Sequence, residues 1–361
     1  MDLVTSWSLR PLPSPASLHV GDALLLSYVE ATNEPIVETW GTTDFCCTPR
    51  QVLAGLRHQE YVRKDRILAV STDDVVLGYA DVNLPLQDNT HLAELEIAVR
   101  PAYRRQGIGS ALHDAAVDLA RSAGRTTVMT DTNYRAEPTG EVLAPDSGPG
   151  GVDPDDPSTR FAVARGWNLE QAYRHSRLDL PLDPDALAAH RADAEAHAGP
   201  DYRLVQWTGP CPERWVEQFA VLSTRMSTDA PMGGLDLEED VWDADRVRAA
   251  DAAHVERGWT LLVMAAEHVP TGTLAAYTFF VVPEHTDEWV SQEDTLVIKE
   301  HRGRRLGMLV KAANLQRLAA EHPTVERVST WNAEENDFML AINVALGFRP
   351  AGGDGTWQRR L

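Results

Sequence analysis

Glycine and arginine residues cluster where an extended apolar segment runs into a helical one. The segment from Leu95 reads LEIAVRPAYRRQGIGSALHDAA. Gly107 and Gly109 carry no side chain, so backbone N–H groups at the start of the helix can approach an anion closely, and the helix dipole adds positive potential there. Arg104 and Arg105 flank the same turn. This combination suits a pyrophosphate group.

Two other phosphate-binding loops are excluded by the same residues. A P-loop ends in GK[ST], which is absent here. A dinucleotide fingerprint requires a third glycine at the position that Leu112 occupies. The turn therefore predicts a different class of phosphate-bearing ligand.

The same arrangement occurs twice, at a constant spacing. Ten residues separate Val99 from Gly109, and ten separate Val297 from Gly307, which is an offset of 198. Two similar tandem domains follow from this repeat. We expect one at residues 1–181, with a mobile insertion at about 134–159, and one at 201–361, joined by a linker at 182–200 that contains an Ala-rich helix. These domains are called the first and second halves below.

The elements that position the turns can be read in the same order in both halves. The first half is expected to open with a strand at Leu3–Leu9. The pattern then predicts a strand, a helix and a further strand around each turn: Leu92–Val99, Gly107–Ala123 and Thr127–Asp131 in the first half, and Asp294–Lys299, Gly307–Ala320 and Arg327–Trp331 in the second. The tryptophans are expected in the cores.

These motifs resemble the GNAT superfamily of acyl-CoA-dependent N-acetyltransferases. The family carries [Q/R]-x-x-G-x-[G/A] at the head of its third helix, which residues 104–109 match fully. Residues 302–307 match except that Arg305 stands at the first glycine, so its backbone must adopt a conformation that a Cβ tolerates. The second half also ends as the family does, with Leu346-Gly347-Phe348. The arrangement is similar to that of tandem two-domain members such as mycothiol synthase.

The resemblance implies a fold, a cofactor and a set of binding residues. Each half would be an α/β (α+β) domain with a mixed, mostly antiparallel sheet flanked by helices, and a gap after the fourth strand would admit the arm of acetyl-CoA. A backbone N–H at this gap would polarise the thioester carbonyl. The implied cofactor-binding residues are Ala98, Val99, Arg104, Arg105, Gln106, Gly107, Ile108, Gly109, Val297, Ile298, Arg302, Gly303, Arg304, Arg305, Leu306, Gly307, Asn332 and Asn336.

Proton transfer is where the sequence departs from the family. Many members place a tyrosine four residues before the glycine of the final Gly-Phe, to protonate the leaving thiolate. Asn343 and Ala162 occupy these positions here, and neither is an acid. Asn343 is still a candidate for a hydrogen bond to the sulfur or the cofactor, with packing as the alternative.

Base candidates lie on the fourth strand of each half. Glu96 and Asp294 hold equivalent positions three residues before the valine. The alternatives are a solvent-facing strand carboxylate, a water relay, or an amine that arrives already deprotonated. His285 is a further candidate on a loop, and His113 is expected at the surface.

Composition narrows the class of partner. Lys+Arg 33 against Asp+Glu 54 gives a net charge of −21, which disfavours binding to nucleic acid and to anionic membranes and weakly favours amine-bearing partners. Three cysteines, two of them adjacent, predict neither a disulfide framework nor a metal site. The first residues do not resemble a secretory signal, so we expect a cytoplasmic protein.

The sequence thus favours an enzyme that transfers an acetyl group from acetyl-CoA to a primary amine of a small molecule. The amine would attack the thioester directly, in the second half, while the first half binds cofactor as a structural or regulatory copy. The alternatives are an acyl-CoA-binding regulatory or structural protein without turnover, and a protein-lysine acetyltransferase. The sequence leaves open the identity of the amine and the acyl chain length. It also leaves open the oligomeric state, for which a homo-oligomer is one alternative.

Overall fold

The strands of the protein form one continuous sheet. The computed structural model describes residues 6–136 and 138–361, and in these residues the sheet has 12 strands. The strands of the first half are β1 (Trp7–Pro11), β2 (Val62–Ser71), β3 (Val76–Pro85), β4 (Leu92–Val99), β5 (Thr127–Tyr134) and β6 (Asn168–Asp179). Those of the second half are β7 (Tyr202–Thr208), β8 (Trp259–His268), β9 (Thr273–Pro283), β10 (Trp289–Val297), β11 (Arg327–Ala333) and β12 (Arg349–Arg360). Residues 3–5 of the predicted first strand lie outside the described part.

Helices cover both faces of this sheet. They are α1 (Ala23–Trp40), α2 (Pro49–Arg57), α3 (Ile108–Ser122), α4 (Pro157–Ala164), α5 (Pro184–Ala198), α6 (Val216–Asp229), α7 (Ala244–Arg257), α8 (Leu306–Glu321) and α9 (Asp337–Leu346). Within the described residues, none of them is long and apolar enough to cross a lipid bilayer.

Alternation along the strands assigns the helices to opposite faces. Leu68 and Val70 of β2 pack in one cluster with Leu25 of α1, whereas Ala69 between them packs with Ile108 of α3. The second half repeats this division on β8, with α6 and α7 on one face and α8 on the other. Each half therefore buries a helix pair on one face and its turn-bearing helix on the other.

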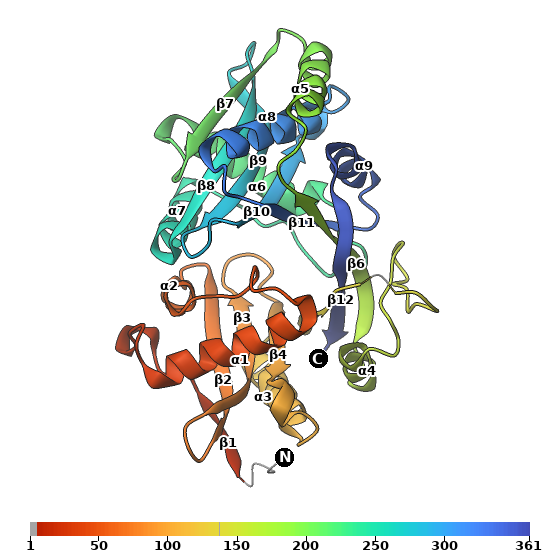
Figure 1. Ribbon diagram of the computed structural model, residues 1–361. Coiled ribbons are helices and arrows are strands. Elements are labelled where there is room, and N and C mark those ends of the chain that lie inside the picture. Colours follow the sequence, from red (N-terminus) through yellow and green to blue (C-terminus); the bar gives the residue numbers. More distant parts are fainter. Residues whose placement is uncertain (1–5, 137) are drawn as a thin grey trace.

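The last strands of the two halves are exchanged. The sheet order at the centre is β5-β12-β6-β11, so the final strand of the second half lies between two strands of the first (Figure 1). Trp357 of β12 is fully buried in the core that contains α3, and Leu178 of β6 packs in a core of the second half. The backbone N–H of the last residue, Leu361, donates to Thr126 O of the first half at 2.8 Å. Each half thus contributes a strand to the other's core.

Two pairs of parallel strands diverge soon after they meet. β4 pairs with β5 only from Leu92 to Glu94, and β10 pairs with β11 only from Trp289 to Ser291. Beyond Glu94 and Ser291, neither β4 nor β10 pairs with β5 or β11 in the described chain. The predicted gap after the fourth strand of each half is therefore present. β10 also carries a bulge between Gln292 and Thr295, which β4 lacks.

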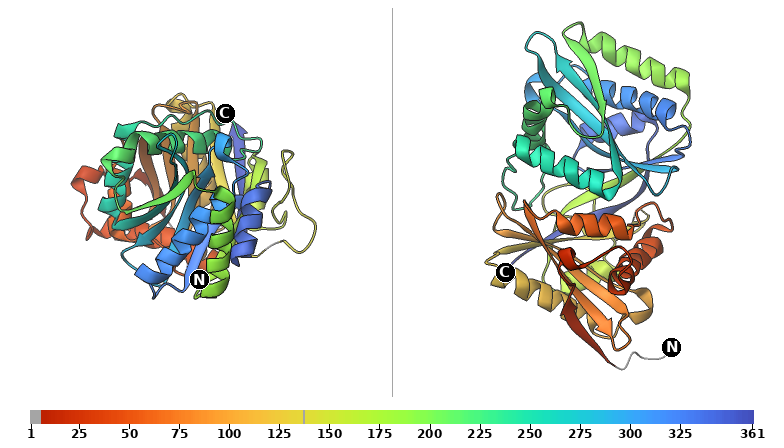
Figure 2. Two further views of the ribbon diagram at one scale, coloured as in Figure 1. Left: turned by 90° about the horizontal axis from the view of Figure 1, so that it is seen from above. Right: turned by 90° about the vertical axis from the view of Figure 1, so that its left-hand side faces the viewer.

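The connection between the halves contains the predicted helix. Asp183 caps α5 by accepting hydrogen bonds from the N–H groups of residues 185 and 186. Ala194 and Ala198 are buried in one cluster with residues of α8, so the helix lies alongside α8 (Figure 2). α5 therefore adds to the core of the second half, and the division at 182–200 stays a proposal.

Strand exchange predicts that a C-terminal substitution destabilises the first half. Trp357→Ala should remove about 3–5 kcal/mol of stability, because it leaves a cavity in the α3 core. Hydrogen exchange read by mass spectrometry should then rise in β4, β5 and α3. Leu262→Ala, in the second-half core, is the matched control and should raise exchange around α8 instead. Faster hydrogen exchange in Trp357→Ala that is confined to the second half would contradict the position of β12 in the first half.

Candidate functional site

The two turns that precede α3 and α8 have the same backbone shape. Each places two residues in the left-handed region, Arg105 (φ 62°) and Gly107 (φ 81°) in the first half, and Gly303 (φ 80°) and Arg305 (φ 55°) in the second. Glycine and arginine have simply exchanged positions. Arg305 therefore adopts a left-handed backbone conformation. This conformation costs a residue with a Cβ about 1–2 kcal/mol, and Arg105 bears the same cost in the first turn.

An arginine fastens each turn to the end of the preceding strand. Arg104 Nε donates to Val99 O at 3.1 Å, and Arg302 Nε donates to Val297 O at the same distance. Their Nη2 atoms bind carboxylates of the opposite-face helices, Glu38 at 2.5 Å and Asp229 at 2.8 Å. These arginines, which we predicted to contact the cofactor, thus hold the turn in place.

The other predicted side chains of the turns have different surroundings. Arg305 pairs with Asp193 of α5, and the Arg304 guanidinium lies 5.7 Å from the ring centroid of Tyr202. Ile108 and Leu306 are buried, so only their backbones are available to a ligand. Gln106 is half-buried.

Backbone N–H groups at the helix starts are left without a partner in the helix. The first i to i−4 bonds are Ala111 N to Gly107 O at 3.1 Å and Leu309 N to Arg305 O at 3.0 Å. The three N–H groups before each of them point out of the helix end with the dipole. A Cβ on Gly107 would meet nothing within 4 Å, so the space in front of the turn is open. This is a cradle for an anion.

The open strand edges present further N–H groups. Arg100 N donates to Leu77 O at 2.9 Å, and Ile298 N donates to Ala275 O at 3.1 Å, so these groups face β3 and β9. By alternation, the N–H groups of Val99 and Val297 face the gap, and that of Ala98 faces β3. Of the four residues predicted at the gap, the two valines are therefore placed to pair with a ligand.

A carboxylate held by a tyrosine lies beside each gap. Tyr79 Oη donates to Glu96 Oε1 at 2.5 Å, and Tyr277 Oη donates to Asp294 Oδ2 at 3.1 Å. Burial raises the pKa of Asp294 to about 6, although the hydrogen bond from Tyr277 lowers it. Burial also holds the pKa of both phenols well above 10, so they remain donors. Sequence reasoning found the acids and missed the tyrosines, which share the offset of 198.

Further polar groups lie close to Glu96. Asp81 accepts from Tyr28 Oη at 2.7 Å and pairs with Arg66 Nε at 2.9 Å. Burial raises the pKa of Asp81 to about 7. Phe279 occupies the equivalent position in the second half. The first site therefore has an acid where the second has an aromatic ring.

The asparagines of the second half form a connected set. Asn343 Nδ2 donates to Asn332 Oδ1 at 2.7 Å, and Asn343 is 1% exposed. Its Oδ1 atom is buried without a hydrogen-bond partner among the described residues. Asn336 caps α9 by accepting from Met339 N at 3.2 Å. Asn332 and Asn343 are thus brought together, while the Asn336 side chain holds the helix start.

The two histidines considered in the sequence analysis lie in different surroundings. His113 is 2% exposed, because Trp167 Nε1 donates to its Nε2 atom at 3.2 Å, so the prediction of a surface position was wrong. Burial lowers the pKa of His113. His285 lies between the halves, where its Nδ1 atom is 3.1 Å from Gln51 Nε2 of α2.

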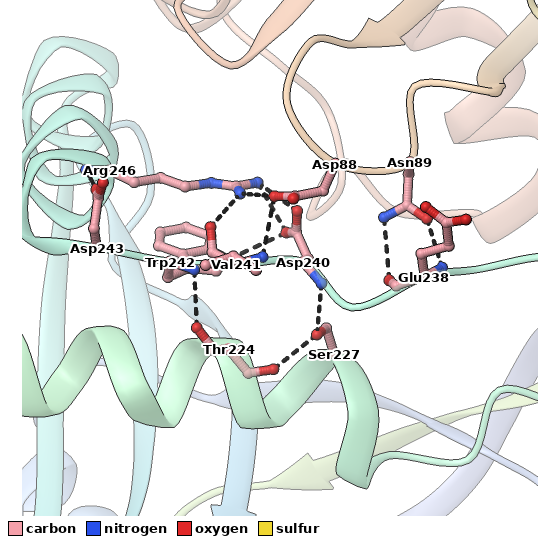
Figure 3. A network of polar contacts seen from close by, with 10 residues as sticks. All are labelled: Asp88, Asn89, Thr224, Ser227, Glu238, Asp240, Val241, Trp242, Asp243 and Arg246. Carbon is pink, nitrogen blue, oxygen red and sulfur yellow. Dashed lines mark hydrogen bonds and ion pairs between the residues drawn. The ribbon is translucent and has the colours of Figure 1, made fainter.

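The segment between α6 and α7 is braced on the first half. Asn89 exchanges two hydrogen bonds with the backbone of Glu238, at 2.7 and 3.2 Å (Figure 3). Arg246 forms ion pairs with Asp88 of the first half, at 3.0 Å, and with Asp240 of the segment, at 2.8 Å. The loop between β3 and β4 therefore fixes this segment in place.

The segment between α1 and α2 is braced on the second half in return. Asp44 pairs with Arg327 at 2.8 Å, and the ring of Phe45 packs edge-on to Trp289 and Trp331, with centroids 5.5 and 5.2 Å away. α1 and α6 share their sheet faces with Tyr79 and Tyr277, respectively. Each acid–tyrosine pair is therefore on the side of the sheet that these segments flank.

Comparison with known proteins agrees with this geometry. Residues 36–139 match the model of the acetyltransferase (GNAT) family. This segment is a GNAT acetyltransferase domain. It contains the first gap and the first turn. No curated protein gave a match.

Solved structures extend the GNAT likeness to the whole chain. A tandem GNAT protein from the clavulanic acid biosynthesis pathway is 26% identical, with a TM-score of 0.74 and 98% of each chain covered. A GCN5-related N-acetyltransferase from Sphaerobacter thermophilus shares the fold at 14% identity, with a TM-score of 0.61, 99% of this chain and 97% of that chain. The chain thus carries a GNAT acetyltransferase domain at residues 36–139, and over its whole length it is similar to a tandem GNAT protein. The family uses acetyl-CoA, whose pyrophosphate and amide-bearing arm suit the cradles and the open strand edges.

Gly107→Glu should abolish cofactor binding in the first half, because the carboxylate repels the pyrophosphate at the cradle. Gly124→Glu is the matched control, since Gly124 ends the same helix with φ 78° and also has open space around its Cβ position. Calorimetric titration with acetyl-CoA should show one site fewer in Gly107→Glu and an unchanged stoichiometry in Gly124→Glu. Equal loss in both variants would assign the effect to backbone strain.

Proposed function

We propose that the protein acetylates a primary amine of a small molecule, by direct attack of the amine on acetyl-CoA in the second half. The observation that carries this proposal is Asp294, a half-buried carboxylate held by Tyr277 beside the gap between β10 and β11. With a pKa of about 6 it is ionised at neutral pH, and it remains basic enough to accept a proton.

The residues of the second half would divide the work as follows. The N–H groups at the start of α8 would hold the pyrophosphate, and Val297 N–H would bind at the thioester carbonyl. Acetyl-CoA, when bound, supplies the activated acetyl group. Asp294 would take the proton of the incoming ammonium, and Tyr277 would keep the carboxylate in position. Direct attack needs no residue of the chain as a nucleophile.

The surroundings of the site support a small, cationic acceptor. The net charge of −21 attracts cations toward the protein. The braced segments 41–48 and 230–243 flank the face on which the acid–tyrosine pairs lie, which supports a small molecule over a protein lysine. The first half, with an equivalent cradle and Glu96, would bind acetyl-CoA as a structural or regulatory copy. A cytoplasmic location stays a prediction.

One observation favours a second candidate function. The residues at the position of the family's tyrosine, Asn343 and Ala162, cannot protonate a thiolate. This supports a protein that binds acyl-CoA without turnover.

Release of free coenzyme A, measured with a panel of small amines and with lysine-containing peptides, separates these functions. We expect acceleration by one class of small amine. Binding of acetyl-CoA without acceleration by any member of the panel would favour the binding protein, and acceleration by peptides alone would favour the protein-lysine acetyltransferase.

Asp294→Asn should lower kcat by about 10²–10⁴-fold, the range for loss of a general base. Glu96→Gln is the equivalent change in the first half. The variant with the larger loss of steady-state turnover identifies the catalytic half, and a larger loss in Glu96→Gln would assign catalysis to the first half.

The pH profile of kcat should show an acid limb near pH 6, because protonation of Asp294 removes the base below its pKa. Tyr277→Phe removes the hydrogen bond that lowers this pKa, so the limb should move to higher pH. Tyr79→Phe, in the first half, tests the specificity of the shift. A limb that stays in place in Tyr277→Phe would show that Asp294 is not the titrating group.

A further inference from the structure

The second half buries an amine that no described group neutralises. Lys311 of α8 is 1% exposed. Its Nζ donates to the thioether sulfur of Met339, at 3.9 Å, and lies 5.4 Å from the ring centroid of Phe348. A buried ammonium without a carboxylate is costly, so its retention calls for a partner that the protein chain does not supply.

The first half shows what a satisfied group at this place looks like. His113 lies 198 residues earlier on α3, and it packs on Trp167 as Lys311 packs on Phe348; both aromatic residues follow the glycine that ends α4 or α9. His113 is hydrogen-bonded on both ring nitrogens, by Trp167 Nε1 at 3.2 Å and Asp114 Oδ1 at 3.0 Å. The equivalent position in the second half therefore holds a basic group whose partners are missing.

Lys311 lies on the face of α8 that looks toward the gap. Gly307 is one turn earlier on this face, and a Cβ on it would be 3.1 Å from Ile342 Cδ1 and 3.7 Å from Val297 Cγ2. Met339, which contacts Lys311, is one turn before Asn343 on α9. Two polar atoms without a hydrogen-bonding oxygen or nitrogen partner, Lys311 Nζ and Asn343 Oδ1, thus occur on facing helices next to the strand whose edge is open.

We propose that Lys311 is the acid of the second half and that its ammonium gives a proton to the coenzyme A sulfur as the thioester is cleaved. The inference rests on the proposed function. The acceptor nitrogen bonds to the acetyl carbon while the carbon–sulfur bond breaks. The ammonium form of the acceptor first loses one proton through Asp294 to water. On attack, Asp294 takes a second proton from the nitrogen, and Lys311 delivers one to the sulfur. Both residues then return to their starting states by exchange with water.

The chemistry of the buried amine suits this role. Burial lowers the pKa of Lys311 to about 7, whereas an ordinary thiol has a pKa near ~8.5, so the proton moves downhill from nitrogen to sulfur. No charged or titratable group on the elements packed against α8 pairs with Lys311 in the described chain. These groups are Asp185, His190, Arg191, Asp193, Glu195 and His197 of α5, Glu267 and His268 of β8, Glu293 and Asp294 of β10, and Asp337 of α9. The sulfur of bound coenzyme A would thus be the group that takes its proton.

The direct test is the titration of bound coenzyme A, followed by the ultraviolet absorbance of its thiolate. It is performed in the Gly107→Glu background, so that only the second half reports. With Lys311 present, the thiol pKa should fall by one unit or more below that of free coenzyme A, and Lys311→Met should reverse the shift. Lys311→Arg, which keeps the charge, should retain part of it. Methionine fills the site without a buried charge, so Lys311→Met is expected to fold.

The outcomes separate the two proposals. Coenzyme A that binds with the same thiol pKa in wild type and Lys311→Met overturns the role of Lys311 and leaves the proposed function standing. Failure of coenzyme A to bind the second half at all overturns the proposed function, and the role of Lys311 with it.

Turnover supplies an independent readout. Lys311→Met should lower kcat by about 10²–10⁴-fold with little change in the KM for acetyl-CoA, and the fall of kcat above pH 7 should disappear. His113→Leu, at the equivalent position of the first half, is the control; it should lower thermal stability and leave kcat near the wild-type value. Loss of KM and kcat together in Lys311→Met, with an unchanged pH profile, would show that the lysine only supports packing.

Discussion

Parallel pairing that stops after three residues is the constraint on which both sites depend. Because β4 leaves β5 after Glu94, and β10 leaves β11 after Ser291, each half keeps a strand edge whose N–H groups have no neighbouring strand. The carboxylates of Glu96 and Asp294 lie on these same free stretches. The helix starts are tied to the strand ends by Arg104 and Arg302. Divergence of two strands thus brings an open backbone edge, an acid and a helix start with unpaired N–H groups to one place.

The sequence predicted the residues that repeat at a fixed spacing. It did not predict side chains whose contact partners lie far away in the sequence. The offset of 198 located both turns, both valines and both acids. It did not reveal Tyr79 and Tyr277, because their neighbours on β4 and β10 are fixed by strand pairing. His113 was placed at the surface because a helix position says nothing of Trp167, 54 residues later. The exchange of β6 and β12 was equally hidden, since an alternating strand does not state which edge it will join.

The two halves reach similar geometries with different chemistry. Glycine and arginine have traded the two left-handed positions of the turn without changing its backbone. Around the acid, the first half has the polar set of Tyr28, Asp81 and Arg66, whereas the second half has Phe279 at the position of Asp81. Duplication has therefore conserved the frame and allowed each site to be tuned separately.

The position of β12 also bears on how the chain is made. Thr127 pairs with Arg360, so β5 acquires its antiparallel neighbour only when β12 has left the ribosome. Domains generally fold as units from the N-terminus during synthesis, but here the first half must wait with one strand edge and the slot for Trp357 unfilled. A nascent chain that is truncated late would present that edge to other chains. Emergence of β12 is therefore the event that closes both halves at once.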